Sequence, residues 1–317
     1  MNRSSTFTGL GIAVLAALAF GMSGPFAKPL LEAGWSPAAA VTMRALVGGL
    51  VLAPFAAIAL KGQWRALWRA RSRILAIGLI GVSATQLAYF AAIERIPVGT
   101  GILIEFMAPL LLVLFVWART RRVPKAVVLI GSVFAVFGLV MVVSPGGGDS
   151  LDPIGLAFAA VAAVGCAIYF VAAARVDDDL PPVAVASVSL IIGGIAIWLI
   201  GLTGVMPLTA TFETVQLFDS SVPWWIPALI VAVLATGVAY ATSIKASQLL
   251  GSRLASFAGL LEVVAATVYA WLLLGEQMTI PQLIGGLLIL VGIGFVQSEK
   301  AAVEVPPVDT ASLERAA

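Results

Sequence analysis

The chain has 317 residues, of which 61% are hydrophobic and only 11% are charged, with a formal net charge of +2, one cysteine and no histidine. Soluble domains contain about 45–50% apolar and about 25% charged residues, so this composition excludes a soluble enzyme; the high hydrophobicity also excludes a disordered chain, and the small net charge argues against nucleic acid as a partner. Without histidine and with a single cysteine, neither a metal nor a cofactor is expected, and the lipid bilayer is the predicted surrounding of the chain.

Ten apolar runs follow one another, each near the roughly 20 residues that a helix needs to cross the hydrocarbon core. They lie at about 8–30, 38–60, 72–93, 98–117, 124–143, 153–174, 182–203, 224–248, 253–274 and 280–297. The joins near Ile96 and Gly251 are the tightest. The first run also fits a signal peptide, but it is long for one and has a counterpart later in the chain, so we expect it to stay in the fold. The predicted fold is all-α, with ten transmembrane helices.

Lysine and arginine gather in alternate loops, and the positive-inside rule turns this pattern into an orientation. The loops after the second and fourth runs carry Lys61, Arg65, Arg69, Arg71, Arg73, Arg119, Arg121, Arg122 and Lys125. Loops on the other side hold Arg95 and several acids. The sequence therefore predicts a multi-pass protein of the cell (inner) membrane with both termini in the cytoplasm.

The first five runs resemble the last five. Four features recur in the same order, at offsets of 144 to 154 residues: Gly21 and Phe26 with Gly165 and Phe170; Pro37, Gly48 and Gly49 with Pro182, Gly193 and Gly194; Ala88 and Tyr89 with Ala239 and Tyr240; Gly131 and Gly138 with Gly285 and Gly292. Because five is odd, the second copy must enter the membrane from the opposite side, and inverted repeats are typical of alternating-access transporters. We expect repeats over 1–148 and 149–297, followed by a disordered cytoplasmic tail over 298–317.

A combination of short segments resembles a known family. These segments are Thr42–Met43–Arg44 before an apolar run, Ala88–Tyr89, Ile96–Pro97, Ala108–Pro109, Leu274–Gly275–Glu276, and Gln282, Gly285 and Gly292. Over about 8–297 the chain is similar to the EamA-type ten-helix exporters of the drug/metabolite transporter superfamily, and among them to the exporters of amino acids, including aromatic ones. It departs from the family pattern at Arg121–Arg122, where Gly-Glu is usual, and at Glu262–Val263, where proline is common. The resemblance implies a small-molecule substrate.

Ionisable residues within the predicted helices are functional candidates, because a charge inside a bilayer is costly. Glu105 and Glu262, in the fourth and ninth runs, either bind a substrate ammonium group or carry a proton, or else make an internal helix–helix hydrogen bond. Arg44, in the second run, either binds a substrate carboxylate or, in the interpretation we favour, is a structural tie to Glu105 or to backbone carbonyls. Lys28 lies near a helix end, where snorkelling accounts for it, and Glu276 is expected to be a cap or a charge marker.

Tyrosines and backbone breaks complete the candidate site. Tyr89, Tyr240 and Tyr169 either line a cavity and offer hydroxyl groups to an amphipathic solute, or pack in the core. Gly24–Pro25 in the first run and Pro109 in the fourth are expected to kink their helices, because proline removes a backbone hydrogen bond. In transporters such breaks often lie at the binding site or at a hinge.

The expected function is a carrier that exports small amphipathic metabolites, with amino acids first among them, by alternating access around a central cavity. The alternatives are an exporter of another metabolite or drug class, a channel, and a membrane-embedded enzyme. The enzyme is disfavoured because the chain has no histidine and no aspartate within a predicted helix, and nothing resembles a channel's selectivity filter. The sequence leaves open whether transport is coupled to protons, and it sets no oligomeric state.

Overall fold

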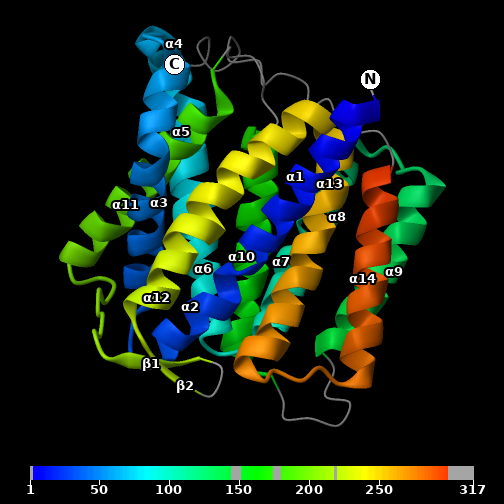
Figure 1. Cartoon of the computed structure of the whole chain (residues 1–317). Coiled ribbons are helices and arrows are strands. Elements are labelled where there is room, and N and C mark those ends of the chain that lie inside the picture. Colours follow the sequence, from blue (N-terminus) through cyan, green and yellow to red (C-terminus); the bar gives the residue numbers. More distant parts are fainter. Residues whose placement is uncertain (1–2, 144–150, 174–179, 218–219, 299–317) are drawn as a thin grey trace, which may run out of the picture.

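The computed structural model describes residues 3–143, 151–173, 180–217 and 220–298, and these are mostly helical (Figure 1). The first half, 3–143, contains α1 (Arg3–Gly21), α2 (Ser23–Glu32), α3 (Pro37–Leu60), α4 (Trp64–Arg69), α5 (Arg71–Ala76), the π-helical segment η1 (Ile77–Ala84), α6 (Thr85–Ile93), α7 (Val98–Glu105), α8 (Ala108–Thr120) and α9 (Ala126–Val143). The second half, 151–298, contains α10 (Pro153–Ala173), α11 (Pro182–Leu202), the strands β1 (Thr214–Leu217) and β2 (Ser220–Pro223), α12 (Trp225–Leu229), the π-helical segment η2 (Ile230–Val238), α13 (Ala239–Leu274) and α14 (Ile280–Ser298). Apart from Ser298, the predicted tail lies outside the described residues.

Most of these helices suit a membrane. Within the described residues eight helical stretches are long and apolar enough to cross one: Thr8–Glu32, Pro37–Leu60, Arg71–Ile93, Val98–Thr120, Ala126–Val143, Pro182–Leu202, Trp225–Ser243 and Ile280–Ser298. Two further apolar stretches, Pro153–Tyr169 and Leu260–Leu274, are shorter. Large apolar side chains such as Phe55, Ile58 and Leu287 are exposed on the outside of the bundle, where lipid covers them at no cost.

The join predicted near Gly251 is not a break in the helix. α13 continues for 36 residues, and Figure 1 shows it rising in yellow and turning to descend in orange. A straight helix of this length would measure about 54 Å, well beyond the roughly 30 Å of a hydrocarbon core. The chain therefore reverses its direction by bending one continuous helix.

The predicted helix breaks lie slightly before the residues expected to cause them. α1 ends and α2 begins around Met22, so Gly24 and Pro25 fall in the first turn of α2. α8 begins at Ala108, with Pro109 as its second residue. Proline fits a first turn because the N–H groups there have no partner within the helix. These prolines thus start a new helix instead of kinking the middle of one.

Two π-helical segments occur in matching places of the two halves. η1 and η2 start at Ile77 and Ile230, which are 153 residues apart. In each segment a hydroxyl group donates to the carbonyl five residues earlier, from Ser83 to Gly78 and from Thr236 to Val231, both at 2.9 Å. Such π turns are rare and are frequent at functional sites.

The offset of the π segments corrects the predicted equivalence of two tyrosines. The sequence pairs Tyr89 with Tyr240, 151 residues apart, and a shift of two residues is about 200° around a helix. The two side chains accordingly have different neighbours. Tyr89 is buried beside Gly24 of α2, whereas the ring of Tyr240 meets the edge of Phe20 of α1 at 5.1 Å.

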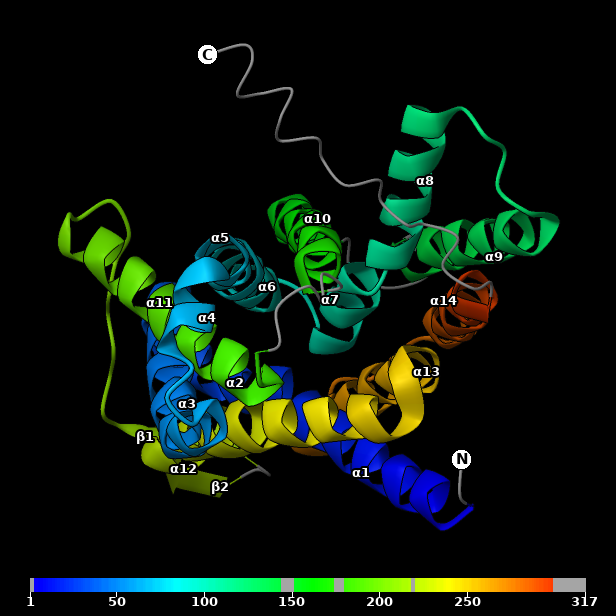
Figure 2. The same cartoon turned by 90° about the horizontal axis from the view of Figure 1, so that it is seen from above.

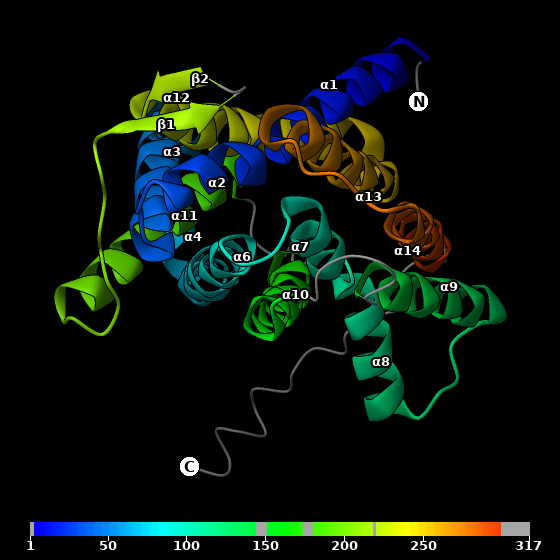
Figure 3. The same cartoon turned by 90° about the horizontal axis from the view of Figure 1, so that it is seen from below.

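Helices of one half pack against helices of the other (Figures 2 and 3). The main pairs are α1 with α13, α3 with α11, α6 with α10, and α9 with α14. In the last pair the backbones touch, because a Cβ placed on Gly131 would lie 2.6 Å from the carbonyl oxygen of Gly292, and one on Gly138 would overlap the carbonyl oxygen of Gly285. These two contacts show that α9 and α14 run antiparallel.

A short hairpin, from Thr214 to Pro223, lies in the stretch 204–223 between two of the predicted helices. β1 and β2 pair antiparallel, with Leu217 opposite Ser220. Val215 and Leu217 are buried and alternate with exposed residues, as in a strand with one buried face. Ser36 Oγ, the N-cap of α3, donates to the carbonyl oxygen of Pro207 at 2.7 Å and ties the preceding loop to the bundle.

Candidate functional site

Arg44 lies at the centre of a buried polar network. Its Nε donates to Thr236 Oγ1 at 3.1 Å, and its Nη1 donates to Ser23 Oγ at 2.7 Å and to Gln86 Oε1 at 2.6 Å. Its guanidinium carbon lies 5.3 Å from the centre of the Phe90 ring. The partners come from α2, α6 and η2, so this one side chain on α3 joins four helices from both halves.

The partners of Arg44 differ from those expected. All three acceptors are neutral side chains, and within the described residues the guanidinium makes neither an ion pair with Glu105 nor a hydrogen bond to a backbone carbonyl. Nη2 makes no hydrogen bond to a described residue. A buried charge held only by neutral groups still favours an anionic partner. Arg44 therefore ties helices together through Nε and Nη1, and its Nη2 is left to donate to a carboxylate.

Two carboxylates lie within electrostatic reach of Arg44. Glu105 is buried at the last residue of α7, and Glu262 is half-buried in α13. The charge of each acts on the other and on Arg44. The carboxyl end of a helix favours a cation, so the end of α7 and the Glu105 side chain together form a place for a positive group.

The three predicted tyrosines lie in the same region. Tyr89 and Tyr240 lie near enough to Arg44, Glu105 and Glu262 to interact with them electrostatically. Tyr169 of α10 is likewise near Tyr240 and Glu262, and its ring packs against η1. We call the six residues the central cluster: Arg44, Glu105, Glu262, Tyr89, Tyr240 and Tyr169.

Tyr89 has an unusual feature within the central cluster. Its side chain is 3% exposed, and its Oη has no hydrogen-bond partner among the described residues. A Cβ on Gly24 would lie 2.5 Å from that oxygen, so only glycine leaves room for it. A buried hydroxyl without a partner is costly, and it is well placed to bind a polar group of a solute.

Sequence reasoning misses the residues that hold Arg44. Ser23, Gln86 and Thr236 are neutral residues inside apolar runs, and neutral polar residues of this kind serve many purposes in helices. Gln86 carries the strongest available signal, since it is the one amide side chain in the predicted helix over 72–93.

A second polar contact joins the halves at the opposite end from the arginine-rich loops. Lys28 Nζ donates to Glu276 Oε1 at 2.7 Å and approaches the carbonyl oxygen of Ile96 at 3.4 Å. The backbone N–H of Val98, the first residue of α7, donates to Glu276 Oε2 at 2.9 Å. We call Lys28, Glu276 and this N–H the outer lock. Snorkelling of Lys28 was the wrong expectation, and Glu276 caps a helix, but one of the other half.

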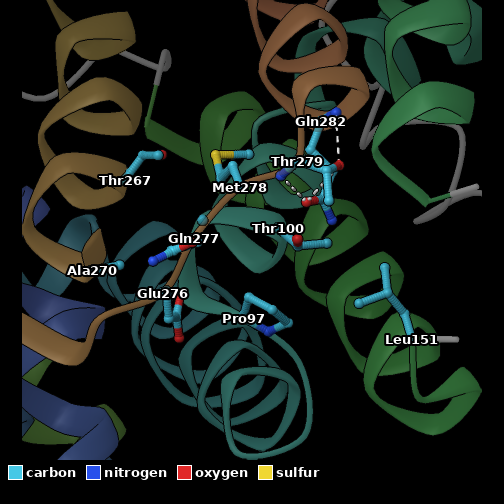
Figure 4. A pocket seen from close by; sticks show the side chains of 11 residues that line it. Pro97, Thr100, Leu151, Thr267, Ala270, Glu276, Gln277, Met278, Thr279 and Gln282 are labelled. Atoms are coloured by element: carbon cyan, nitrogen blue, oxygen red, sulfur yellow. Dashed lines mark hydrogen bonds between the residues drawn. The ribbon is translucent and has the colours of Figure 1, made fainter. Parts of the chain in front are cut away.

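A cavity of about 190 Å³ adjoins the outer lock (Figure 4). It lies between the halves and is lined by Pro97, Gly99, Thr100, Leu151, Thr267, Ala270, Glu276, Gln277, Met278, Thr279 and Gln282. Its wall at α14 is fixed by a capping box, in which Thr279 N–H donates to Gln282 Oε1 at 2.9 Å and Gln282 N–H reaches Thr279 Oγ1 at 3.4 Å.

An exposed ion pair also lies at this end of the molecule. Arg95 Nη1 is 3.3 Å from Asp152 Oδ2, and the two side chains are 42% and 31% exposed. The N–H of Ile154 donates to Asp152 Oδ1 at 2.8 Å, and this hydrogen bond, with the nearby arginine, lowers the pKa of Asp152. Among the described residues no group of three or more acidic or cysteine side chains could hold a metal ion.

Comparison with known proteins assigns the family. The model of the EamA-like transporter family matches residues 7–144 and 153–297. An uncharacterised inner membrane transporter, YicL, of Salmonella typhimurium is 25% identical over 296 residues, which cover 90% of this chain and 94% of the relative. A crystal structure of a protein with 20% identity shares the fold, with a TM-score of 0.59 over 93% of this chain and 96% of that chain. The chain therefore belongs to the EamA-like transporter family, within the drug/metabolite transporter superfamily, and is a multi-pass membrane transporter.

Proposed function

We propose that the protein exports small amphipathic metabolites, with amino acids first among them and aromatic ones included, by alternating access around the central cluster. The observation that carries this proposal is a buried cation and two carboxylates contributed by both halves to the interior of a membrane bundle. Such charges are rare inside a bilayer and usually belong to a substrate or ion pathway.

The chemistry of the central cluster suits a zwitterion. Arg44 offers a donor to a carboxylate, which an arginine fork binds well. Glu105, at the negative end of α7, and Glu262 offer acceptors to an ammonium group. The Phe90 ring lies 5.3 Å from the Arg44 guanidinium and packs on Tyr89, so aromatic side chains border these charges. A sugar or an uncharged drug has no need of two opposite charges in its binding site.

The architecture proposed for this carrier is ten transmembrane helices in two inverted repeats, over 1–148 and 149–297. The antiparallel packing of equivalent helices supports the inversion. α9 and α14 have the glycine contacts described above, and in α3 and α11 a Cβ on Gly49 would meet Ile191 while one on Gly194 would meet Leu46. Higher numbers in one helix thus face lower numbers in the other, as an axis in the membrane plane requires.

The proposed location is the inner membrane, with both termini in the cytoplasm. The relative YicL is named as an inner membrane transporter, and the arginine-rich loops predict the orientation. The hinge positions proposed for the transport cycle are Gly24, Pro25 and Pro109, because each stands just after an interruption in a helix of the first half.

Proton coupling through the two carboxylates is part of the proposal. Without histidine, Glu105 and Glu262 are the groups within the described bundle that fit a proton carrier. Glu262 is the better candidate, since it is half-buried and therefore more open to water than Glu105. Protonation of Glu262 would release a bound ammonium group by removing the opposite charge.

Counterflow in proteoliposomes tests the proposal. Proteoliposomes that contain the purified protein are loaded with a panel of unlabelled amino acids. Entry of labelled amino acid is then measured with and without a pH gradient. We expect saturable counterflow in the wild type and loss of the gradient dependence in Glu262→Gln. The matched control is Glu94→Gln, which neutralises an exposed carboxylate outside the central cluster.

Each outcome of this experiment decides something. Absence of amino-acid flux from protein that elutes as a single folded species would overturn the substrate class. Flux that ignores the gradient in the wild type would remove proton coupling and leave a facilitator. Flux without saturation or counterflow would indicate a channel.

A further inference from the structure

We propose that the outer lock is a gate that closes the central cluster from the outside, and that it must open once in every transport cycle. This inference rests on the proposed function and on the predicted orientation. Lys28 and Val98 belong to the first half and Glu276 to the second, so the contact spans the boundary across which the two halves move in alternating access.

The contacts of Glu276 are those of a gate that closes firmly and still can open. Its carboxylate receives the Lys28 ammonium at 2.7 Å and the Val98 N–H at 2.9 Å. The positive amino end of α7 adds to the attraction. The two charged side chains are each 15% exposed, so water reaches them and compensates for their charges when they separate, which a fully buried pair would not allow.

The outer lock lies next to Tyr89 of the central cluster. Val98 donates its N–H to Glu276, and its side chain packs where a Cβ on Gly24 would lie 2.5 Å from Val98 Cγ1 and from Tyr89 Oη. Lys28 lies one turn further along α2 than Gly24. Separation of Glu276 from α7 therefore frees the end of α7 that covers Tyr89.

The cavity beside the outer lock gives the boundary room to move. Residues of α7 form one wall, and the ends of α13 and α14 form the other. Figure 4 shows Glu276 on the α13–α14 connection facing Pro97 at the start of α7. Because close-packed interiors resist sliding, an unfilled space at the moving boundary lowers the resistance to opening.

Thiol labelling from outside tests the gate. In a Cys166→Ala background, Val98→Cys reports access, since Val98 is 0% exposed in this structure. Right-side-out vesicles are treated with a membrane-impermeant maleimide. We expect Lys28→Gln and Glu276→Gln each to raise the labelling rate several-fold.

The control uses the exposed ion pair at the same end. Arg95→Gln and Asp152→Asn also break a contact between the halves, but one that does not cover the central cluster, so labelling of Val98→Cys should stay slow. Unchanged labelling in both Lys28→Gln and Glu276→Gln would overturn the gate. Equal acceleration in the Arg95 and Asp152 variants would do so as well, because it would reveal general loosening.

A second measurement asks whether the gate must open. Lys28→Cys and Glu276→Cys are joined with a short bifunctional thiol reagent that a reductant can cleave. Transport of whichever solute the wild type carries should stop on cross-linking and return on cleavage, whereas transport that continues would contradict the proposal. Labelling needs no substrate, so failure of the amino-acid proposal and failure of the gate are told apart.

Discussion

At the scale of single residues, a substitution of Arg44 tests whether the forked shape of its guanidinium group is required. A lysine keeps the charge but cannot reach Ser23, Gln86 and Thr236 from two nitrogens at once. We expect Arg44→Lys to lower the free energy of unfolding by about 1.5–3 kcal/mol, the range for hydrogen bonds to a charged group, and to abolish counterflow. Thermal unfolding in detergent and counterflow measure the two effects. Wild-type transport in Arg44→Lys would contradict a role in binding.

A substitution of Tyr89 tests substrate binding separately from packing. Because its buried Oη has no described partner, Tyr89→Phe should leave the unfolding temperature unchanged or raise it, since a lone hydroxyl costs about 1–3 kcal/mol. If that oxygen binds the substrate, KM should rise while folding is unaffected. The control is Tyr269→Phe, a half-buried tyrosine outside the central cluster. An unchanged KM in Tyr89→Phe would show that the hydroxyl does not bind the substrate, and a fall in stability would show that it has a partner in the folded protein.

The charged members of the central cluster can be predicted from the sequence, and their neutral supports cannot. Arg44, Glu105 and Glu262 stand out because a charge is rare in an apolar run. Gln86 becomes visible only when the structure places it 2.6 Å from Arg44. Lys28 is misread for another reason: its partner lies 248 residues away in the sequence, and no local pattern reports a contact over that separation.

At the scale of helices, the touching backbones of α9 and α14 leave no space for a side chain. A methyl group on Gly138 would meet the carbonyl oxygen of Gly285. We expect Gly138→Ala to destabilise the protein by about 1–3 kcal/mol, the usual penalty for overpacking. Gly11→Ala is the control, because nothing lies within 4 Å of its added methyl group, and it should be neutral or slightly stabilising. Thermal unfolding of both variants decides, and equal midpoints would contradict the close contact.

Hydrophobic runs predict where helices lie, but not where a helix departs from regular α-helical geometry. Most of the described helices overlap the predicted runs, because a length of apolar residues is a strong signal, whereas α4 lies in a predicted loop and α13 continues through a predicted join. The π turn at Ser83 depends instead on one hydroxyl that donates to Gly78 and to Gly193 of another helix, so it is fixed by tertiary contact. The strand that contains Val215 and Leu217 is short, so its alternation of apolar and polar residues does not stand out from chance in the sequence.

At the scale of the whole molecule, the orientation in the membrane can be measured directly. In a Cys166→Ala background, Glu213→Cys and Arg65→Cys place thiols at exposed positions near opposite ends of the bundle. In right-side-out vesicles we expect an impermeant maleimide to label Glu213→Cys at once and Arg65→Cys only after the membrane is permeabilised. The reverse pattern would invert the orientation and place the outer lock on the cytoplasmic side.

The glycine contacts between α9 and α14 have the form of an isologous interface. Gly131 meets Gly292 and Gly138 meets Gly285, and each glycine would bring its methyl group against its partner's carbonyl. Two identical subunits related by a twofold axis meet in this way. Two separate five-helix subunits that carried these glycines would meet through the same contact, without any new surface. Joining both halves in one chain makes the contact intramolecular, at an effective concentration that two free subunits in a membrane would seldom reach.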